Sequence, residues 1–380
     1  MMPEPTVAPS QGTRLRFGGA NLLRTLAVLA VLYSHISYYL IDDLGTGWWV
    51  IDVVYETLVD GVKLNQHLSF LGVAVFMMLT GLLLTASVAR TAPSRFLVNR
   101  IGRLLPALWI AVALAILLVT LGINGMFSGQ DGITYGQSAL SFVLGGFFLT
   151  PEVAVLGVTW TLVVQITFYL YSVATRPLLR RAPIAVPILG AVLCIGVLLY
   201  NVYIPQPYSV PMLTKVAATL PAVFLGQIIY MAWTSMASWR WLVVAALAQA
   251  EVVLIATDIR AYWAGDRYLW TIAVVAAAVL VLARYDGPIA HWSVVRWTGT
   301  RSYAIYLLHT LILYRAYDLA VGALGKTGAV IVFLAVTAVA SELLYKLVEV
   351  PAGRWIGSLA SRVGNPKPSV RGKSEVADAA

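Results

Sequence analysis

The sequence predicts an all-α membrane protein, a polytopic helix bundle with about ten transmembrane helices. Of its 380 residues, 60% are hydrophobic and only 11% are charged, and the mean hydropathy is +0.82. Soluble domains do not reach these values. Apolar runs of membrane-spanning length also recur along the chain, separated by short polar segments.

Ten apolar runs are bounded by charged residues, proline or glycine and are long enough to cross a hydrocarbon core. They cover residues 20–41, 66–88, 97–122, 155–177, 183–202, 212–233, 238–258, 267–284, 300–322 and 326–349. The apolar run at 137–149 is shorter. We expect it to form an interfacial or re-entrant helix instead of a span.

The distribution of lysine and arginine predicts the orientation, because cytoplasmic loops retain positive charge. With the N-terminus inside, the inner segments hold 18 of these residues and the outer segments hold five. An eleventh span would move the basic run at 176–181 outside. We therefore expect both termini in the cytoplasm, with a cytoplasmic N-terminal segment at 1–19, a membrane-embedded domain at 20–355 and a cytoplasmic, disordered tail at 356–380. No cleavable signal peptide is expected.

The net charge of +9 is explained by these inner loops, so nucleic acid is not an expected partner. The single cysteine, Cys194, lies within an apolar run. No intrachain disulfide and no metal site are therefore expected. Spans rich in alanine and valine and poor in lysine are typical of a high-GC bacterium, which predicts the cytoplasmic (inner) membrane of a bacterium as the location.

The first span carries Arg24 and His35, eleven residues apart. At ~1.5 Å per residue they are separated by roughly 16 Å along the helix, and they share one face because eleven residues make almost three turns. Such side chains are costly in lipid unless they face protein, water or a ligand, which predicts a functional site. The structural alternative is an interfacial arginine and a hydrogen-bonded histidine.

Two further segments carry residues that lipid-facing helices rarely need. Gly72, Thr80 and Gly81 in the second span predict close packing against neighbouring helices. Arg100 and Arg103 lie one turn apart at the inner surface. They fit an anchor to the inner surface and also fit a site for phosphate groups.

The segment 157–170 carries Trp160, Gln165 and Tyr169 at spacings of five and four residues, near mid-depth. Gln165 is not expected to face lipid. The segment 299–314 carries four polar side chains along one span: Ser302, Tyr303, Tyr306 and His309. The two tyrosines also fit the interfacial aromatic belt, whereas His309 lies deeper and is expected to act in or beside a site.

Taken in order, these segments resemble the acyltransferase family 3 membrane proteins, which include O-acetyltransferases of bacterial surface polysaccharides and macrolide 3-O-acyltransferases. The resemblance runs from residue 20 to about 355. Its motifs here are Arg24 and His35 with ten residues between them, the glycine-containing second span, Arg100-x-x-Arg103, Trp160-Thr161-Leu162, Ser302-Tyr303 with Tyr306 and His309, and Val348-Glu349-x-Pro351 with Arg354.

The resemblance implies transfer of a short acyl group, acetyl above all, from acyl-CoA to a hydroxyl, with no metal. His35 would be the central catalytic residue, because a neutral imidazole can take the proton of an attacking hydroxyl. The other residues of the implied catalytic site are Gln165 and His309, and those of the implied coenzyme A site are Arg24, Arg100, Arg103, Trp160, Ser302 and Tyr303.

One residue departs from the family pattern. Family members usually carry a glutamate five residues after the tryptophan of the WxL motif, where this chain has Gln165. A glutamine can orient a histidine but cannot stabilise an imidazolium as a carboxylate does. Another acid such as Asp42, Asp43 or Glu152 would then replace the glutamate, the reaction would depend less on ion pairing, or the glutamine would be an engineered substitution.

The resemblance implies a hydroxyl-bearing acceptor and leaves its class open between a polysaccharide or glycolipid and a macrolide-type polyketide. A proton-coupled transporter or exporter is the competing function, since ten spans with buried Arg and His also suit transport. That alternative needs acids at mid-membrane, where the sequence offers only Glu251, Glu342 and Glu349. An inactive binding protein is a third alternative. No soluble hydrolase domain is expected after residue 355.

Overall fold

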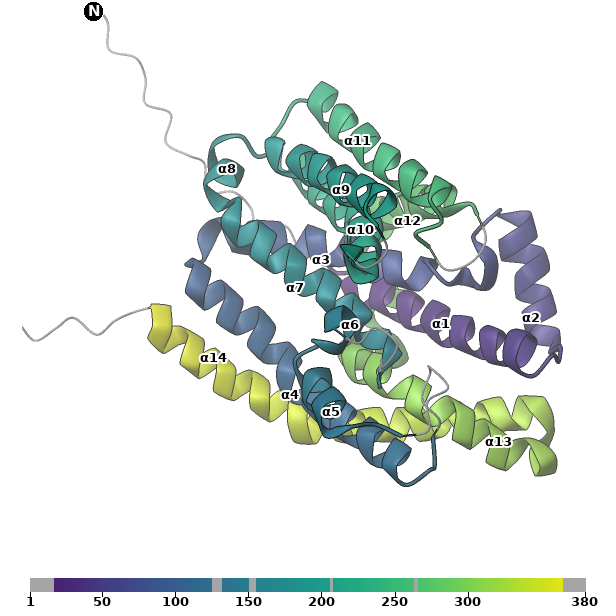
Figure 1. Cartoon of the computed structure of the whole chain (residues 1–380). Helices are drawn as coiled ribbons and strands as arrows, with labels where there is room; N and C mark the ends of the chain where they lie inside the picture. The colour runs from purple at the N-terminus through teal and green to yellow at the C-terminus, as the bar shows by residue number, and fades with distance from the viewer. Residues whose placement is uncertain (1–16, 125–131, 150–154, 206–207, 263–265, 365–380) are drawn as a thin grey trace, which may run out of the picture.

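The computed structural model describes residues 17–124, 132–149, 155–205, 208–262 and 266–364, and the regular elements in this part of the chain are all helical. Figure 1 shows them as one bundle. In chain order they are α1 (Ala20–Tyr38), η1 (Tyr39–Asp43), α2 (Trp49–Val54), η2 (Tyr55–Gly61), η3 (Gln66–Leu68), α3 (Leu71–Arg90), α4 (Pro93–Thr120), α5 (Tyr135–Phe142), α6 (Gly146–Leu149), η4 (Gly157–Thr159), α7 (Trp160–Ala174), α8 (Arg176–Arg181), α9 (Ala185–Tyr203), α10 (Pro211–Trp233), α11 (Trp239–Asp258), α12 (Tyr268–Leu282), η6 (Pro288–His291), α13 (Ser293–Leu344), η7 (Tyr345–Glu349) and α14 (Val350–Gly364).

The predicted all-α membrane bundle is confirmed. Within the described residues, eight helices are long and apolar enough to cross a membrane, and α12 is a shorter apolar helix. The last of the eight contains two of the expected spans, so the ten expected spans are accounted for. The apolar run at 137–149 forms the short helices α5 and α6, in agreement with the expectation that it does not span.

The long helix α13 folds back on itself at Gly325, whose φ of 64° and ψ of 178° are not helical. A hydrogen bond of 3.1 Å joins Arg301 Nη2 to Glu342 Oε1 across this turn. In a straight helix these residues would be separated by roughly 60 Å. Glycine reaches a positive φ without a Cβ clash, which permits the reversal. The turn and α2 lie together at one end of the bundle (Figure 1).

The centre of the bundle is built from α1, α3 and α10, because α3 contacts both of the others. A Cβ added at Gly81 would lie 1.8 Å from the Val223 carbonyl oxygen, and one at Gly226 would lie 1.9 Å from the Met78 carbonyl oxygen. Each helix therefore presents a glycine to the backbone of the other. At Gly72 the added Cβ would lie 2.6 Å from a carbonyl oxygen of α1. The packing predicted for the second span is thus observed.

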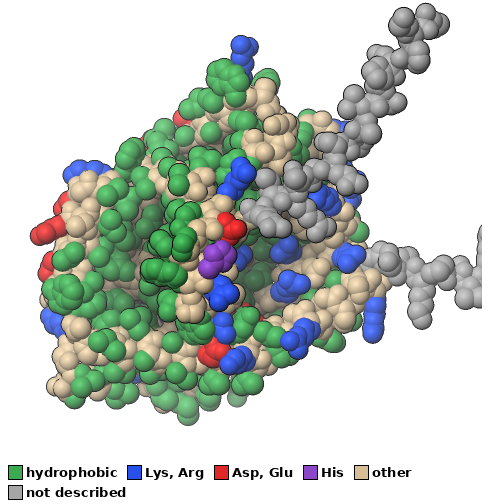
Figure 2. Space-filling model, turned by 180° about the vertical axis from the view of Figure 1, so that it is seen from behind, with side chains coloured by type: hydrophobic (Ala, Val, Ile, Leu, Met, Phe, Trp, Pro, Cys, Tyr) green, Lys and Arg blue, Asp and Glu red, His purple; other side chains and the backbone are tan. Residues whose placement is uncertain are grey.

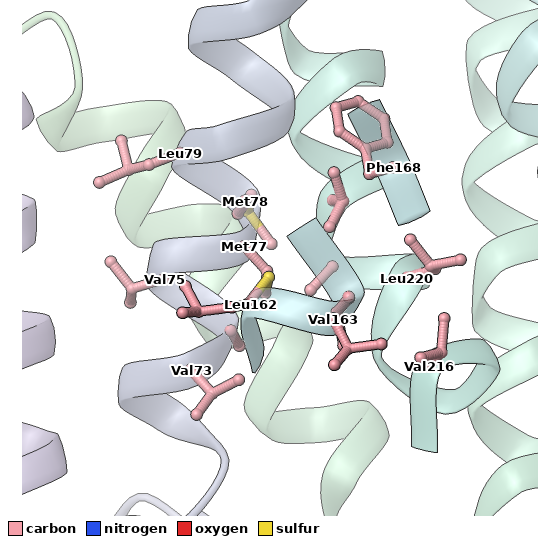
Figure 3. Packing of buried hydrophobic residues seen from close by; sticks show 14 of the residues in the cluster. Val73, Val75, Met77, Met78, Leu79, Leu162, Val163, Phe168, Val216 and Leu220 are labelled. Atoms are coloured by element: carbon pink, nitrogen blue, oxygen red, sulfur yellow. The ribbon is translucent and has the colours of Figure 1, made fainter. Parts of the chain in front are cut away.

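A hydrophobic core joins α3 to α7 and α10, as Figure 3 shows. Met77 of α3 and Leu162 of α7 lie together in its centre, and the labelled side chains of α10 lie beside Val163 of α7. This contact fixes the depth of α7, which carries the Trp160-Thr161-Leu162 motif, relative to the central helices. Most of α10 is buried, whereas most residues of α4, α9 and α11 are only partly buried or exposed, as expected of lipid-facing helices.

The helix α14 extends beyond the residue at which the disordered tail was expected to begin. We expected the membrane domain to end at residue 355 and a disordered tail to begin at 356, but α14 continues to Gly364. Its Ile356 and Ala360, one turn apart, are buried, and Ile356 packs against Gly102 of α4. This apolar contact provides the physical reason for the longer helix, and residues 365–380 lie outside the described part of the chain.

The start of α1 and the end of α14 lie toward the same end of the bundle (Figure 1). An even number of spans requires this arrangement. Seen from behind in Figure 2, Lys and Arg side chains gather on the half of the face that corresponds to this end, and several of them line a hollow. The asymmetry of charge that predicted the orientation is therefore visible on the folded surface.

Candidate active site

Two histidines from distant parts of the chain meet inside the bundle. His35 lies near the end of α1, and His309 lies on the first half of α13. The His309 Nε2 atom is 3.3 Å from the His35 Nδ1 atom. Their rings meet edge to face, with centroids 4.7 Å apart and an interplanar angle of 76°. His309 is fully buried, and His35 is half-buried.

The backbone around the pair assigns a proton position to each neutral ring. The Nδ1 atom of His309 lies 3.1 Å from the Ile305 carbonyl oxygen and 2.8 Å from that of Tyr306. Carbonyl oxygens only accept, so this nitrogen carries the proton and Nε2 presents a lone pair to His35. The Nδ1 atom of His35, 3.0 Å from the Val31 carbonyl oxygen, is then also the protonated nitrogen. The Nε2 atom of His35 is left as the basic atom of the pair.

Tyr306 connects the histidine pair to α7. Its hydroxyl donates to the Val158 carbonyl oxygen at 2.5 Å and lies 2.8 Å from the Thr161 hydroxyl. Its ring contacts that of Phe76 on α3, with centroids 6.3 Å apart. Tyr306 therefore acts as a structural link within the bundle and not as an interfacial residue. Our sequence reasoning assigned Thr161 no role of its own, although it lies within the Trp160-Thr161-Leu162 motif.

Gln165 lies in a different set of contacts from the histidine pair. Its side-chain oxygen accepts a hydrogen bond of 3.3 Å from Tyr169, one turn further along α7. The Tyr169 ring meets that of Phe96 on α4 at 6.0 Å, and the Arg100 guanidinium lies 5.9 Å from the centre of the Phe96 ring. A chain of contacts through Tyr169 and Phe96 thus links Gln165 to Arg100 of α4.

Of the acids expected as partners of His35, Asp42 has a different partner. Asp42 pairs with His67, its Oδ2 atom lying 3.3 Å from the His67 Nε2 atom. Asp42 reaches His67 because the chain continues from α1 into η1, which brings Asp42 close to the start of α3. Glu152 lies outside the described residues. Among the described residues, the hydrogen bonds of the His35 ring go to Val31 and His309.

The residues expected to bind coenzyme A lie on α1, α4, α7 and α13. Arg24 donates a hydrogen bond of 3.2 Å to Asn21, close to the start of α13, where Thr25 donates to the Val295 carbonyl oxygen. The Tyr303 hydroxyl donates to the Leu104 carbonyl oxygen at 2.9 Å, which holds α13 directly beside the exposed Arg103. Trp160 and Ser302 are buried.

Two acids that a transporter would need at mid-membrane have structural or surface positions. Glu342 accepts hydrogen bonds from Arg301 and from Trp297, the latter at 2.8 Å, and Lys346 lies 2.9 Å from it. Its charge is therefore balanced within this cluster. Glu251 lies on an exposed face of α11.

The chain matches the family described as acyltransferase domain over residues 17–345. It is also 27% identical to "Nodulation protein 10" of Rhizobium leguminosarum bv. viciae, in an alignment that covers 94% of this chain and 98% of the relative. No solved structure matches it significantly. Since the family match covers most of the chain, the protein belongs to the acyltransferase 3 family, as a helical membrane acyltransferase.

Proposed function

We propose that the protein is an O-acyltransferase that moves a short acyl group, acetyl above all, from acyl-CoA to a hydroxyl-bearing acceptor. The observation that carries this proposal is the contact between His35 and His309. It gives the first-span histidine a fixed tautomer and a basic nitrogen inside the bundle, on the residue that the family motif marks. The proposed location is the bacterial cytoplasmic membrane.

In the proposed reaction, the Nε2 atom of His35 takes the proton of the acceptor hydroxyl as its oxygen attacks the thioester carbonyl. The carbon–sulfur bond then breaks, and the departing thiolate receives that proton from the imidazolium. His309 does not exchange a proton in this scheme. Its Nε2 lone pair accepts from the protonated Nδ1 atom of His35, which holds the tautomer and stabilises the transient positive charge.

In this role, His309 orients His35 and stabilises its positive charge, as the family's glutamate was expected to do. A neutral imidazole stabilises a cation less strongly than a carboxylate does. It also leaves no net charge in the buried site between proton transfers, which avoids the cost of a buried carboxylate without a partner. Gln165 then needs no contact with His35.

The arginines of α4 are the proposed site for the coenzyme A phosphates. Arg100 and Arg103 lie on the face that Tyr303 attaches to α13, and Lys and Arg side chains gather at this end of the bundle (Figure 2). Arg24 would add a third cation from α1. Guanidinium groups bind phosphate through paired hydrogen bonds. A pantetheine arm can span the ~16 Å between the levels of Arg24 and His35.

The acceptor class is proposed more broadly, as a carbohydrate, a glycolipid or a macrolide-type polyketide. Trp49 is 63% exposed at the outer end of the bundle, next to Trp48. Exposed tryptophans offer flat apolar surfaces to sugar rings and macrolides alike. The test is release of free thiol from acetyl-CoA by the purified protein in nanodiscs, with each acceptor class supplied in turn.

The proposal predicts thiol release that depends on one acceptor class and yields its acyl ester. Absence of transfer with every class and every short acyl-CoA would overturn it. The same protein in proteoliposomes provides the comparison with transport. Proton uptake coupled to movement of an unmodified solute would favour the transporter instead.

A further inference from the structure

A second cluster of polar side chains, formed by Ser37, His67 and Asp42, lies at the outer end of α1, apart from the His35 pair. The Nδ1 atom of His67 lies 2.7 Å from the Ser37 hydroxyl oxygen. Its other ring nitrogen, Nε2, lies 3.3 Å from Asp42 Oδ2. Ser37 and His67 are almost fully buried, with exposed fractions of 1% and 2%, whereas the Asp42 side chain is 46% exposed.

The hydrogen bonds of this cluster determine which atoms donate and which accept. A carboxylate only accepts, so the His67 Nε2 atom carries the proton that faces Asp42. The Gln66 amide, whose nitrogen is placed 3.2 Å from the same atom, must then be turned so that its oxygen accepts from this N–H. In the neutral ring the Nδ1 atom then presents its lone pair to the Ser37 hydroxyl. A hydroxyl, an imidazole and a carboxylate are thus connected in the order that activates a serine nucleophile.

The backbone holds His67 in an unusual conformation. His67 and Leu68 have φ values of 54° and 52°, in the left-handed region that side chains with a Cβ rarely adopt. The His67 ring stacks on that of Tyr38, with centroids 4.4 Å apart and an angle of 28° between the planes. The backbone N–H of Asn65 donates to the Thr271 hydroxyl at 2.9 Å, which anchors this segment to α12. Such strained residues persist where the surrounding structure holds them, and they gather at functional sites.

The cluster is separate from the candidate active site. Ser37 follows His35 by two residues, which turns its side chain by roughly 200° around the helix axis. His35 faces α13, whereas Ser37 faces η3. The polar partners of the His67 ring are Ser37, Asp42 and Gln66, so neither histidine of the first site takes part.

We propose that Ser37, His67 and Asp42 form a second acyl-transfer site, which takes a short acyl group from an oxygen ester at the outer surface. The Ser37 oxygen attacks the ester carbonyl while its proton moves to His67 Nδ1. The carbon–oxygen bond to the leaving alcohol breaks, and the alcohol leaves with that proton. Water or a second hydroxyl then attacks the Ser37 ester, His67 takes the attacking proton, and the Ser37 oxygen regains it on release.

Because Ser37 and His67 are almost fully buried, the proposed ester carries a small acyl group and would have to reach Ser37 from the side of Asp42, whose side chain is 46% exposed. The reaction needs no coenzyme. The proposal therefore stands independently of the function proposed for His35, and the two can fail separately.

The test uses the full chain in nanodiscs with p-nitrophenyl acetate. After a brief incubation and an acid quench, peptide mass spectrometry locates the acetyl group. The proposal predicts an acetyl ester on Ser37 in the unaltered protein and its loss in the Ser37→Ala variant. Ser34→Ala removes another buried serine one turn earlier and should keep the label on Ser37.

Release of p-nitrophenolate provides the second measurement. It should fall clearly below the rate of the unaltered protein for Ser37→Ala and stay unchanged for Ser34→Ala. Thermal unfolding of both variants shows whether they fold alike. An unlabelled Ser37 in the unaltered protein, or equal release by the two serine variants, would overturn the proposal.

Discussion

The Nε2 atom of His309 lies 3.3 Å from the Nδ1 atom of His35, and these residues are 274 positions apart in the chain. The contact joins the first membrane helix to the first half of α13. Because two carbonyl oxygens fix the proton of His309 on its Nδ1 atom, its Nε2 lone pair faces His35, and His35 Nε2 is the basic atom of the pair that remains available to a substrate. The predictions below follow from this arrangement and from the packing that supports it.

Replacing His309 with phenylalanine keeps a ring in the site and removes the lone pair that faces His35. We expect kcat to fall by about 10²-fold, the loss typical of a displaced catalytic group, with KM for acyl-CoA unchanged. Thr310→Val, at the next buried position, is the matched control. A higher KM with an unchanged kcat would assign His309 to substrate binding instead.

The Gln165→Glu variant tests whether the family's usual glutamate is needed. Gln165 accepts from the Tyr169 hydroxyl, and a carboxylate can accept the same hydrogen bond. Since His309 already partners His35, we expect no increase in turnover. An increase of several orders of magnitude would show that His35 lacks a carboxylate in this chain.

Much of the fold could be predicted from sequence, because span length, charge asymmetry and small residues act locally. The ten spans and the close packing at Gly81 are examples. The extension of α14 could not be predicted from the sequence, because it depends on the contact of Ile356 with Gly102 of a distant helix. A signal for it existed, in the spacing of Ile356 and Ala360.

The candidate site shows the same division. The motifs marked His35 and His309 separately, and helical spacing placed each within a span. Their contact depends on how α1 packs against α13, which no local pattern encodes. The cluster at His67 was missed altogether, because the importance of this residue depends on a left-handed backbone beside Ser37.

The Gly81→Ala variant tests the central packing. Its Cβ would lie 1.8 Å from the Val223 carbonyl oxygen, so α3 and α10 must move apart. We expect the free energy of unfolding to fall by about 3 kcal/mol, which is at the upper end of the cost of overpacking a core. The midpoint of thermal unfolding in detergent should therefore be lower. Gly196→Ala on α9, where an added Cβ meets nothing within 4 Å, should leave the midpoint unchanged or raise it. Equal midpoints for both variants would contradict the packing.

The Arg100→Gln variant tests the proposed phosphate site. Loss of one charged hydrogen bond to phosphate, worth about 1.5 kcal/mol, should raise KM for acyl-CoA about tenfold and leave kcat unchanged. Arg95→Gln, at an exposed position nearer the start of α4, should change neither value. A lower kcat with unchanged KM would place Arg100 outside the coenzyme site.

The rate of thiol release from acetyl-CoA by the His35→Ala variant, with a productive acceptor present, tests the central claim most directly. Loss of a general base predicts a fall of about 10²- to 10⁴-fold. The Ser34→Ala variant, altered at the neighbouring buried residue, should retain the full rate. A His35→Ala protein that transfers the acyl group at the unaltered rate would contradict the role of His35 as the catalytic base.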